Sequence, residues 1–180
     1  MQRETRRLIL RGWTDADRAP MAAIQGDSAV RQFFYRTATP EQVNADIDLA
    51  MERWRSGGFH FFAAELKATG RVIGLIGLGK ISDLVRSAIP GGPEVEIGWV
   101  LDKQVWGQGL AVEGALESLR YAWSLGIPEV VAFTARLNLP SQRVMQKLGM
   151  NHDPAGDFRN PRIPPDHPLS EHVVYRIRRP

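Results

Sequence analysis

The chain has 180 residues, of which 43% are hydrophobic and 24% are charged, a composition that argues against intrinsic disorder and against a coiled coil. Because cysteine is absent, disulfide bonds, thiolate metal sites and a cysteine nucleophile are excluded. The formal net charge of +3 comes from scattered basic residues, not from the clustered footprint that binds nucleic acid. No apolar run approaches the ~20 residues of a membrane span. We therefore expect one soluble, cytoplasmic domain over residues 1–180 that binds neither nucleic acid nor membrane.

The N-terminal half is predicted to begin with a strand, followed by two helices and a hairpin. The clearest helix start is at Thr39 and Pro40, where Thr39 can cap the helix and Gln42 can close the capping box. Beyond Gly58 the hydrophobic period changes from that of a helix to that of a strand. The expected elements are a strand over 5–11, helices over 14–25 and from Thr39 to the stop at Gly57, and strands over 59–66 and 71–81.

The C-terminal half is predicted to alternate strands with helices. Two segments rich in proline, 82–93 and 153–168, are predicted to be loops. The order β-α-α-β-β-β-α-β-α-β predicts a mixed α/β fold with a largely antiparallel middle. The expected elements of this half are strands over 94–101, 129–135 and 173–177, a strand that begins near 151, and helices over 109–125 and 138–148.

One segment combines a strand, a turn with two glycines and the start of a helix. The first N–H groups of a helix lack internal partners and lie at the positive end of its dipole, so they bind phosphate groups. Gly107 and Gly109 let the backbone approach an anion, although a purely structural turn has the same pattern. A dinucleotide site is disfavoured because Val112 occupies the third glycine position and no acidic residue ends the next strand. No P-loop Gly-Lys-Ser or Gly-Lys-Thr follows either.

Two motifs in this half of the chain resemble those of a known family. Gln104-x-x-Gly107-x-Gly109, between a strand and a helix, resembles the acyl-CoA signature of the GNAT N-acetyltransferase superfamily. The run from Asn138 to Met150 resembles the Asn-x-x-Ser-x-x-Val-x-x-Lys-Leu-Gly-Phe pattern of the ribosomal-protein N-terminal (RimJ/RimL-type) branch. The order of elements matches this family over the whole chain.

The resemblance implies a single-domain α/β fold with a twisted, mostly antiparallel sheet flanked by helices. Its fourth and fifth strands would splay apart and hold acetyl-CoA, the acyl donor, in the gap, without a metal. The pantetheine arm would pair with the backbone of Trp99, Val100 and Leu101, as an added strand does. The remaining residues implied to bind the cofactor are Gly107, Gln108, Gly109, Leu110 and Ala111 at the pyrophosphate, Gln104 beside that turn, and Asn138 and Ser141 on the next helix.

The reaction implied by the resemblance is the direct attack of a neutral amine on the thioester in a ternary complex. A carboxylate must take the proton of the amine, and the strand alternation makes Glu96 the first candidate. Glu94 lies on the same face, and Glu65 is a third candidate. The alternative interpretation of Glu96 is a solvated strand face or a salt bridge.

Two donors are expected to assist the transfer. The candidate donor to the oxyanion is the N–H of Val100. Ser141 is the candidate donor to the departing thiolate, because Met145 stands where many family members have a tyrosine.

The sequence leaves the amine acceptor open. A protein N-terminus, a polyamine, an amino acid and an antibiotic amine are all compatible with it, and the long segment 153–168 is the candidate for shaping the acceptor pocket. A non-catalytic acyl-CoA-binding or sensing domain is the alternative function. A monomer and a homodimer are both compatible with the sequence.

Overall fold

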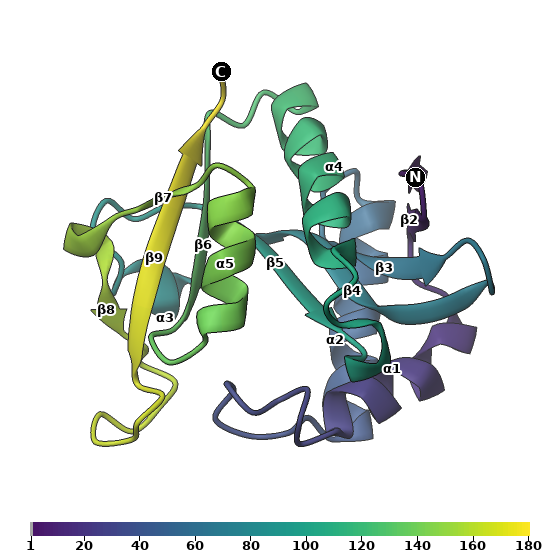
Figure 1. The fold of residues 1–180 in the computed structure, drawn as a ribbon, viewed down its shortest axis with the longest axis horizontal. Coiled ribbons are helices and arrows are strands. Elements are labelled where there is room, and N and C mark those ends of the chain that lie inside the picture. Colours follow the sequence, from purple (N-terminus) through teal and green to yellow (C-terminus); the bar gives the residue numbers. More distant parts are fainter. Residues whose placement is uncertain (1) are drawn as a thin grey trace.

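A computed structural model describes residues 2–180, and within them nine strands form one sheet with helices on both faces (Figure 1). The strand order is β1-β2-β3-β4-β5-β6-β9-β7, and β8 pairs with β9 beside this path. All neighbouring strands are antiparallel except β5 and β6. This arrangement confirms the predicted mixed α/β fold with its mostly antiparallel sheet.

The strands are β1 (Gln2–Glu4), β2 (Leu8–Arg11), β3 (Phe61–Leu66), β4 (Arg71–Lys80), β5 (Val95–Leu101), β6 (Glu129–Ala135), β7 (Asn151–His152), β8 (Phe158–Arg159) and β9 (Glu171–Arg178). The α-helices are α1 (Arg18–Gly26), α2 (Pro40–Arg55), α3 (Asp83–Arg86), α4 (Leu110–Ser124) and α5 (Leu139–Lys147). Short 3-10 turns are η1 (Asp15–Asp17), η2 (Lys103–Val105) and η3 (Pro154–Gly156).

The strand predicted over 5–11 is regular only at β2 (Leu8–Arg11), and residues 5–7 form a turn that joins β2 to a strand that was not predicted, β1 (Gln2–Glu4). The turn closes because the N–H of Thr5 donates to the Leu8 carbonyl and the N–H of Leu8 donates to the Thr5 hydroxyl, both at 2.9 Å. The two segments predicted to be loops also contain regular structure. Helix α3 lies within 82–93, and η3 and β8 lie within 153–168.

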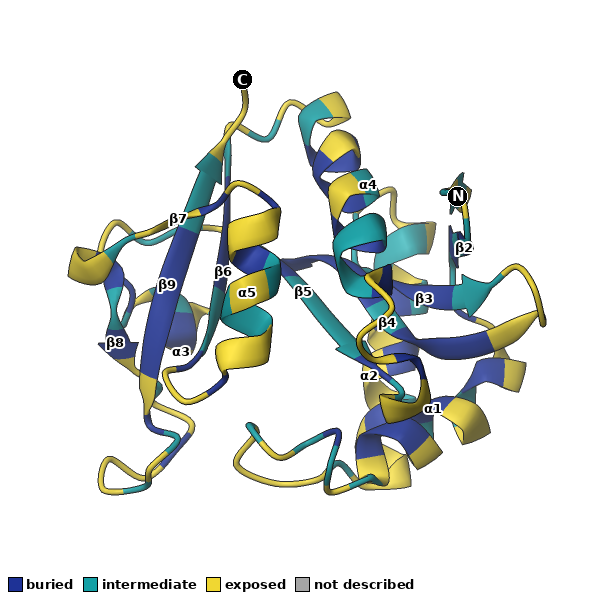
Figure 2. Cartoon of the chain, in the orientation of Figure 1, coloured by how far each residue is buried: buried dark blue, intermediate teal, exposed yellow. Residues whose placement is uncertain are grey.

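The hydrophobic core lies on both faces of the sheet. Figure 2 shows buried residues in dark blue along the central strands and on the helices that pack against them. On one face, α4 and α5 pack on the sheet through Leu110, Leu119 and Met145. On the other face, α1 and α2 pack through Met21 and Ile47. Because side chains alternate along a strand, β5 presents its odd-numbered residues to the α4 face and its even-numbered residues to the α2 face.

Candidate active site

A cleft opens where β5 and β6 separate. The two strands pair in parallel at one described position, Glu96 with Val131, and β5 then runs away from β6 (Figure 1). The cleft has a volume of about 1320 Å³ and is continuous from the start of α4 to the N-terminal half of α2. These are the fourth and fifth strands of the predicted order, so the predicted splay is confirmed.

The register of β4 with β5 determines which backbone groups face this gap. The N–H of Ile81 donates to the Glu94 carbonyl, and the N–H of Asp102 donates to the Ile73 carbonyl. Hydrogen-bonded pairs alternate along an antiparallel ladder, so the even-numbered residues of β5 direct their N–H and C=O toward β4. The N–H groups of Trp99 and Leu101 therefore face the gap.

This register makes one sequence-based prediction wrong. Val100 is paired with Leu75, and its carbonyl oxygen lies so close to Gly74 that a Cβ there would collide with it. The N–H of Val100 points to β4 for the same reason and cannot donate to an oxyanion in the gap. The carbonyl group of Leu101 is also occupied, because it accepts a hydrogen bond from the indole Nε1 of Trp106 at 2.9 Å.

The glycine turn leads directly into α4. Gly107 and Gly109 have φ of 75° and 77°, a left-handed conformation that residues with a Cβ rarely adopt. Gly109 is the N-cap of α4, so the free N–H groups of the first helical turn follow it. Gly107, Gly109 and Ala111 line the cleft. Leu110 does too, although it is 1% exposed and its side chain packs in the core.

The two glutamines of the motif turn their side chains away from the cleft. The Gln104 Oε1 accepts from Arg71 Nη1 at 3.1 Å, and the Gln104 N–H donates to the Asp102 carboxylate at 2.9 Å. The Gln108 Nε2 reaches back to the Gln104 carbonyl at 3.4 Å. These contacts place Gln104 beside the turn. They leave the backbone of Gln108, not its side chain, as the part that can contact a ligand in the cleft.

Helix α5 brings Asn138 and Ser141 to the opposite wall of the cleft. Asn138 is the cap of this helix, since its Oδ1 accepts from the Ser141 N–H at 3.2 Å. Its Nδ2 donates to the Ser141 hydroxyl at 3.0 Å and to the Thr134 hydroxyl at 2.8 Å. The Ser141 oxygen is thus an acceptor within the protein, which leaves its own proton for the cleft.

Glu96 is the one of the three candidate carboxylates that lines the cleft. Burial raises the pKa of Glu96 to about 7, although the positive charge of Arg162 acts in the opposite direction. A carboxyl group that titrates near neutral pH suits a general base. Glu94 is exposed, and Glu65 accepts from Arg11 Nε at 2.7 Å in an ion pair outside the cleft.

The space beside Gly98 is filled by an aromatic ring. A Cβ on Gly98 would lie 3.2 Å from Cε1 of Phe61, and a Cβ on Gly79 would lie 2.8 Å from the same ring. Gly98 therefore leaves no open space beside it for a substrate. The ring instead covers the strand surface next to Glu96 and contributes to its desolvation.

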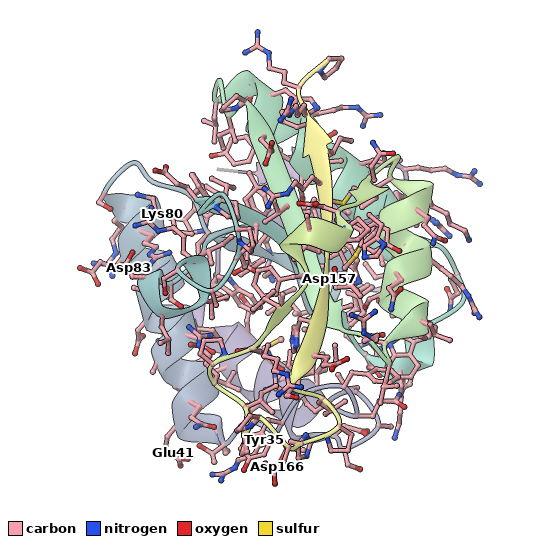
Figure 3. The ribbon with its side chains drawn as sticks, turned by 90° about the vertical axis from the view of Figure 1, so that its left-hand side faces the viewer. Tyr35, Glu41, Lys80, Asp83, Asp157 and Asp166 are labelled. Carbon is pink, nitrogen blue, oxygen red and sulfur yellow. The ribbon has the colours of Figure 1, made fainter. Side chains whose placement is uncertain are left out.

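Two further segments line the cleft at the end away from the glycine turn. The lining comes from residues 30–37, from Asn160, Arg162 and Ile163, and from His60. Burial lowers the pKa of His60 to about 4, and the charge of Arg53 acts in the same direction. Arg162 is held by a 2.6 Å bond from its Nη2 to the Ser82 hydroxyl. The rings of Tyr35 and His167 meet edge to face at 5.1 Å, and Figure 3 shows Tyr35 beside Asp166 at this end of the molecule. No motif signalled these residues.

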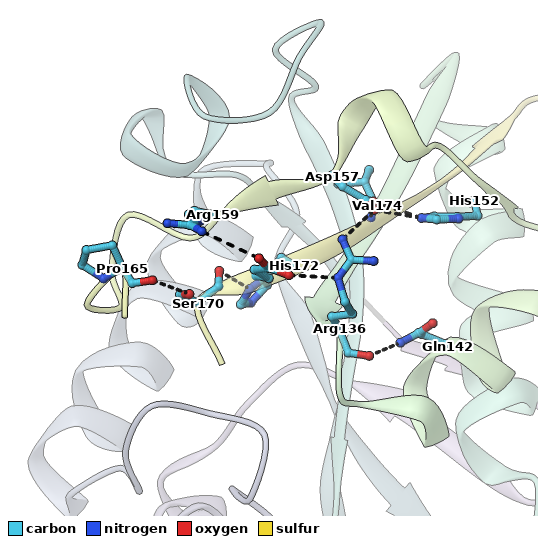
Figure 4. Close-up of polar contacts among 10 residues, drawn as sticks. Arg136, Gln142, His152, Asp157, Arg159, Pro165, Ser170, His172 and Val174 are labelled. Atoms are coloured by element: carbon cyan, nitrogen blue, oxygen red, sulfur yellow. Dashed lines mark hydrogen bonds and ion pairs between the residues drawn. The ribbon is translucent and has the colours of Figure 1, made fainter. Parts of the chain in front are cut away.

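The segment 153–168 is anchored by polar contacts to β9, to Arg136 just after β6 and to Ser170 just before β9 (Figure 4). The Asp157 carboxylate accepts from the Val174 N–H at 3.0 Å and from Arg136 Nη2 at 3.2 Å. The Ser170 hydroxyl donates to the Pro165 carbonyl at 3.0 Å. This anchoring gives Asn160, Arg162 and Ile163 a defined place beside the cleft.

A cleft with a phosphate-type turn at one end and a desolvated carboxylate at the other is the arrangement of an acyl-CoA-dependent transferase. The chain belongs to the GNAT acetyltransferase family: the family model described as "Acetyltransferase (GNAT) domain" matches residues 7–151. The protein is an acyl-CoA-dependent N-acetyltransferase, which confirms the family and activity predicted from the two motifs.

Three known proteins show how far the similarity extends. A GNAT-family acetyltransferase of Bacillus anthracis is 24% identical, with a TM-score of 0.78 over 99% of this chain and 98% of its own. The ribosomal L7/L12 N-acetyltransferase RimL, solved with coenzyme A, is 14% identical, with a TM-score of 0.72 over 97% of this chain and 95% of its own. An Aspergillus fumigatus enzyme, FsC-acetyl coenzyme A-N(2)-transacetylase, is 43% identical over 58 residues. That match spans 32% of this chain and 25% of the fungal enzyme.

Residues 2–180 contain no group of three or more histidine, aspartate or glutamate side chains that could hold a metal ion. No helix in the same part of the chain is both long and apolar enough to cross a bilayer.

Proposed function

We propose that this protein transfers the acetyl group of acetyl-CoA to a primary amine by direct attack in a ternary complex, with Glu96 as the base. The observation that carries the proposal is the single continuous cleft that joins the glycine turn to Glu96. We treat residues 1–180 as one N-acetyltransferase domain, because the strands of residues 2–180 share one sheet.

The residues of the cleft fit acetyl-CoA, which would supply an acyl carbon bonded to a thiol leaving group. The free N–H groups after Gly109 suit the pyrophosphate, with the backbone of Gly107 and Gln108 completing the turn. The gap-facing backbone of Trp99 and Leu101 suits the pantetheine amides. Further residues proposed to contact the cofactor are the side chain of Val100, the backbone of Leu110 and Ala111, and Asn138 and Ser141, while Gln104 supports the turn.

Cations on α5 complete this binding surface. Arg143 and Lys147 line the same cleft one helical turn apart, and neither forms an ion pair within the described residues 2–180. Two unpaired positive charges are suited to the phosphate groups of the cofactor.

In the transfer, the amine nitrogen bonds to the acyl carbon and the carbon–sulfur bond breaks. The Glu96 carboxylate takes the amine proton, directly or through a water molecule. The N–H of Trp99 faces the gap and replaces Val100 as the proposed donor to the carbonyl oxygen. The Ser141 hydroxyl donates a hydrogen bond to the departing sulfur, and its orientation is set by the bond from Asn138 Nδ2.

The proposal is tested by measuring thiol release from acetyl-CoA with a panel of amines. The panel should represent peptides with a free N-terminus, polyamines, amino acids and aminoglycosides. Calorimetry with acetyl-CoA alone should give binding. Thiol release that depends on one amine class, and that Glu96→Gln lowers without loss of binding, would support the proposal. Binding without turnover across the panel would favour the non-catalytic alternative.

A further inference from the structure

The glycine turn is held from outside the cleft by an arginine of the β1–β2 turn. Arg7 Nη1 donates to the carbonyl oxygen of Gln108 at 2.8 Å, and Arg7 Nη2 lies 3.7 Å from the position that a Cβ on Gly109 would occupy. Gln108 stands between two glycines, whose backbone is the most flexible of all residues. Its carbonyl therefore depends on an external partner for a defined direction.

Glu113, in the first turn of α4, holds Arg7 in turn. Its Oε2 accepts from Arg7 Nε at 2.7 Å, and its Oε1 accepts from the Arg7 N–H at 2.7 Å and from the Thr5 hydroxyl at 2.6 Å. The Glu113 N–H donates to the Gly109 carbonyl at 3.1 Å. Burial disfavours the charged form of Glu113, but the bonds from Thr5 and Arg7 outweigh it and lower its pKa, so the carboxylate is charged at neutral pH.

We propose that Thr5, Arg7 and Glu113, which we call the brace, position the glycine turn for the phosphate groups of acetyl-CoA. Arg7 holds the Gln108 carbonyl on the outer side of the turn, so that the partial negative charge of this oxygen does not face the anion. The turn is thereby ordered before the cofactor binds, and the entropy lost on binding is smaller. The brace rests on the proposed function, since it presupposes that acetyl-CoA binds at this turn.

The chain contains a matched control for the brace. Arg3 Nη1 and Glu117 Oε1 form an ion pair at 3.0 Å that also joins the β1 region to α4, one helical turn beyond Glu113. No hydrogen bond of Arg3 or Glu117 reaches residues 107–111 in the described part of the chain. Both ion pairs join the N-terminal residues 3–7 to α4, but only the pair of Arg7 with Glu113 contacts the glycine turn. Comparing variants of the two pairs therefore separates the anchoring of α4 from the positioning of the turn.

The experiment compares wild type with Arg7→Gln, Arg7→Lys and Arg3→Gln by calorimetry with acetyl-CoA, by thermal unfolding and by steady-state kinetics. Arg7→Gln should bind acetyl-CoA about tenfold more weakly, the loss expected for one charge-assisted hydrogen bond. Its KM for acetyl-CoA should rise while kcat at saturation stays unchanged. Arg7→Lys should remain weak, because an ammonium group lacks the planar fork that joins Glu113 to Gln108. Arg3→Gln should keep wild-type affinity.

Two outcomes would overturn the brace. One is an acetyl-CoA affinity of Arg7→Gln equal to that of Arg3→Gln. The other is full recovery of affinity in Arg7→Lys, which would mean that positive charge alone matters. If Arg7→Gln does not fold, Glu113→Gln provides the test, because it retains Arg7 and should also weaken acetyl-CoA binding. Failure of wild type to bind acetyl-CoA would instead contradict the proposed function, so the two failures are distinguishable.

Discussion

Replacing Glu96 with glutamine should slow the reaction and, above neutral pH, make the fold more stable. Burial raises the pKa of Glu96 from 4.5 to about 7, with Arg162 in opposition. At ~1.4 kcal/mol for each pKa unit, holding the charged carboxylate in this environment costs about 3 kcal/mol of folding free energy. Glu96→Gln removes the charge and nearly preserves the shape of the side chain, so it removes this cost together with the base.

The pH dependence of stability isolates the electrostatic part of this effect. In the unfolded chain Glu96 loses its proton near its ordinary pKa of 4.5, whereas in the folded protein it does so only near 7. The folded state therefore loses stability as the pH rises through this window, and below it both states are protonated and no cost arises. The free energy of unfolding of Glu96→Gln minus that of wild type should grow by about 3 kcal/mol between about pH 4 and about pH 8.5. Urea unfolding at several pH values measures it.

The same charge should control the rate. Only the carboxylate form accepts a proton, so kcat/KM of wild type should rise as the pH passes about 7 and should then level off. Loss of a general base lowers rates by about 10²- to 10⁴-fold. Glu94→Gln is the matched control: Glu94 lies two residues away on the same face but is exposed, so neither rate nor stability should change.

Two results would refute this reasoning. A stability difference that does not change with pH would mean that Glu96 is not a desolvated carboxyl group. A full rate for Glu96→Gln on the plateau above about pH 7 would mean that another group takes the proton. The first result contradicts the electrostatics of the cleft and the second contradicts the assignment of the base, so the two parts of the prediction can fail separately.

Three further substitutions test the two walls of the cleft. Gly109→Val should destabilise the fold by about 1–2 kcal/mol, since its φ is 77°, and should abolish acetyl-CoA binding; unchanged affinity in a folded variant would contradict the phosphate turn. Ser141→Ala should lower kcat by roughly 10- to 150-fold, the value of one hydrogen bond to a charged group, with little change in melting temperature, and an unaffected kcat would show that the thiolate leaves unaided. Asn138→Ala removes the cap of α5 and should cost ~1 kcal/mol in thermal unfolding, a loss that Ser141→Ala should not share.

The glycine turn could be predicted from the sequence because its geometry is local. Gly107 and Gly109 adopt the left-handed backbone that their lack of a Cβ permits, and α4 begins at the next residue. The capping box of Thr39 and Gln42 forms as predicted for the same reason. Local chemistry also explains Asn138, whose short amide side chain is preferred at a helix cap.

The orientation of backbone groups could not be predicted in this way. Whether the N–H of Val100 faces the gap depends on its pairing with Leu75, 25 positions away in the chain, as the register shows. The filling of the space beside Gly98 depends on Phe61, which comes from another strand. The bond between Arg7 and Glu113 joins residues separated by 106 positions. Neither composition nor periodicity contains such pairings.

The sequence alone could not choose among the three candidate carboxylates, because the choice depends on contacts between distant segments. Alternation along β5 predicts the face of Glu96 but not its environment, which depends on the ring of Phe61 and on Arg162 from the segment after β8. Glu65 forms an ion pair with Arg11, a partner from β2, and does not line the cleft. The glycine-turn side of the cleft is thus recognisable from short motifs, because its geometry is local. The side that surrounds Glu96 is assembled from segments without any motif, so its electrostatics depend on the tertiary structure.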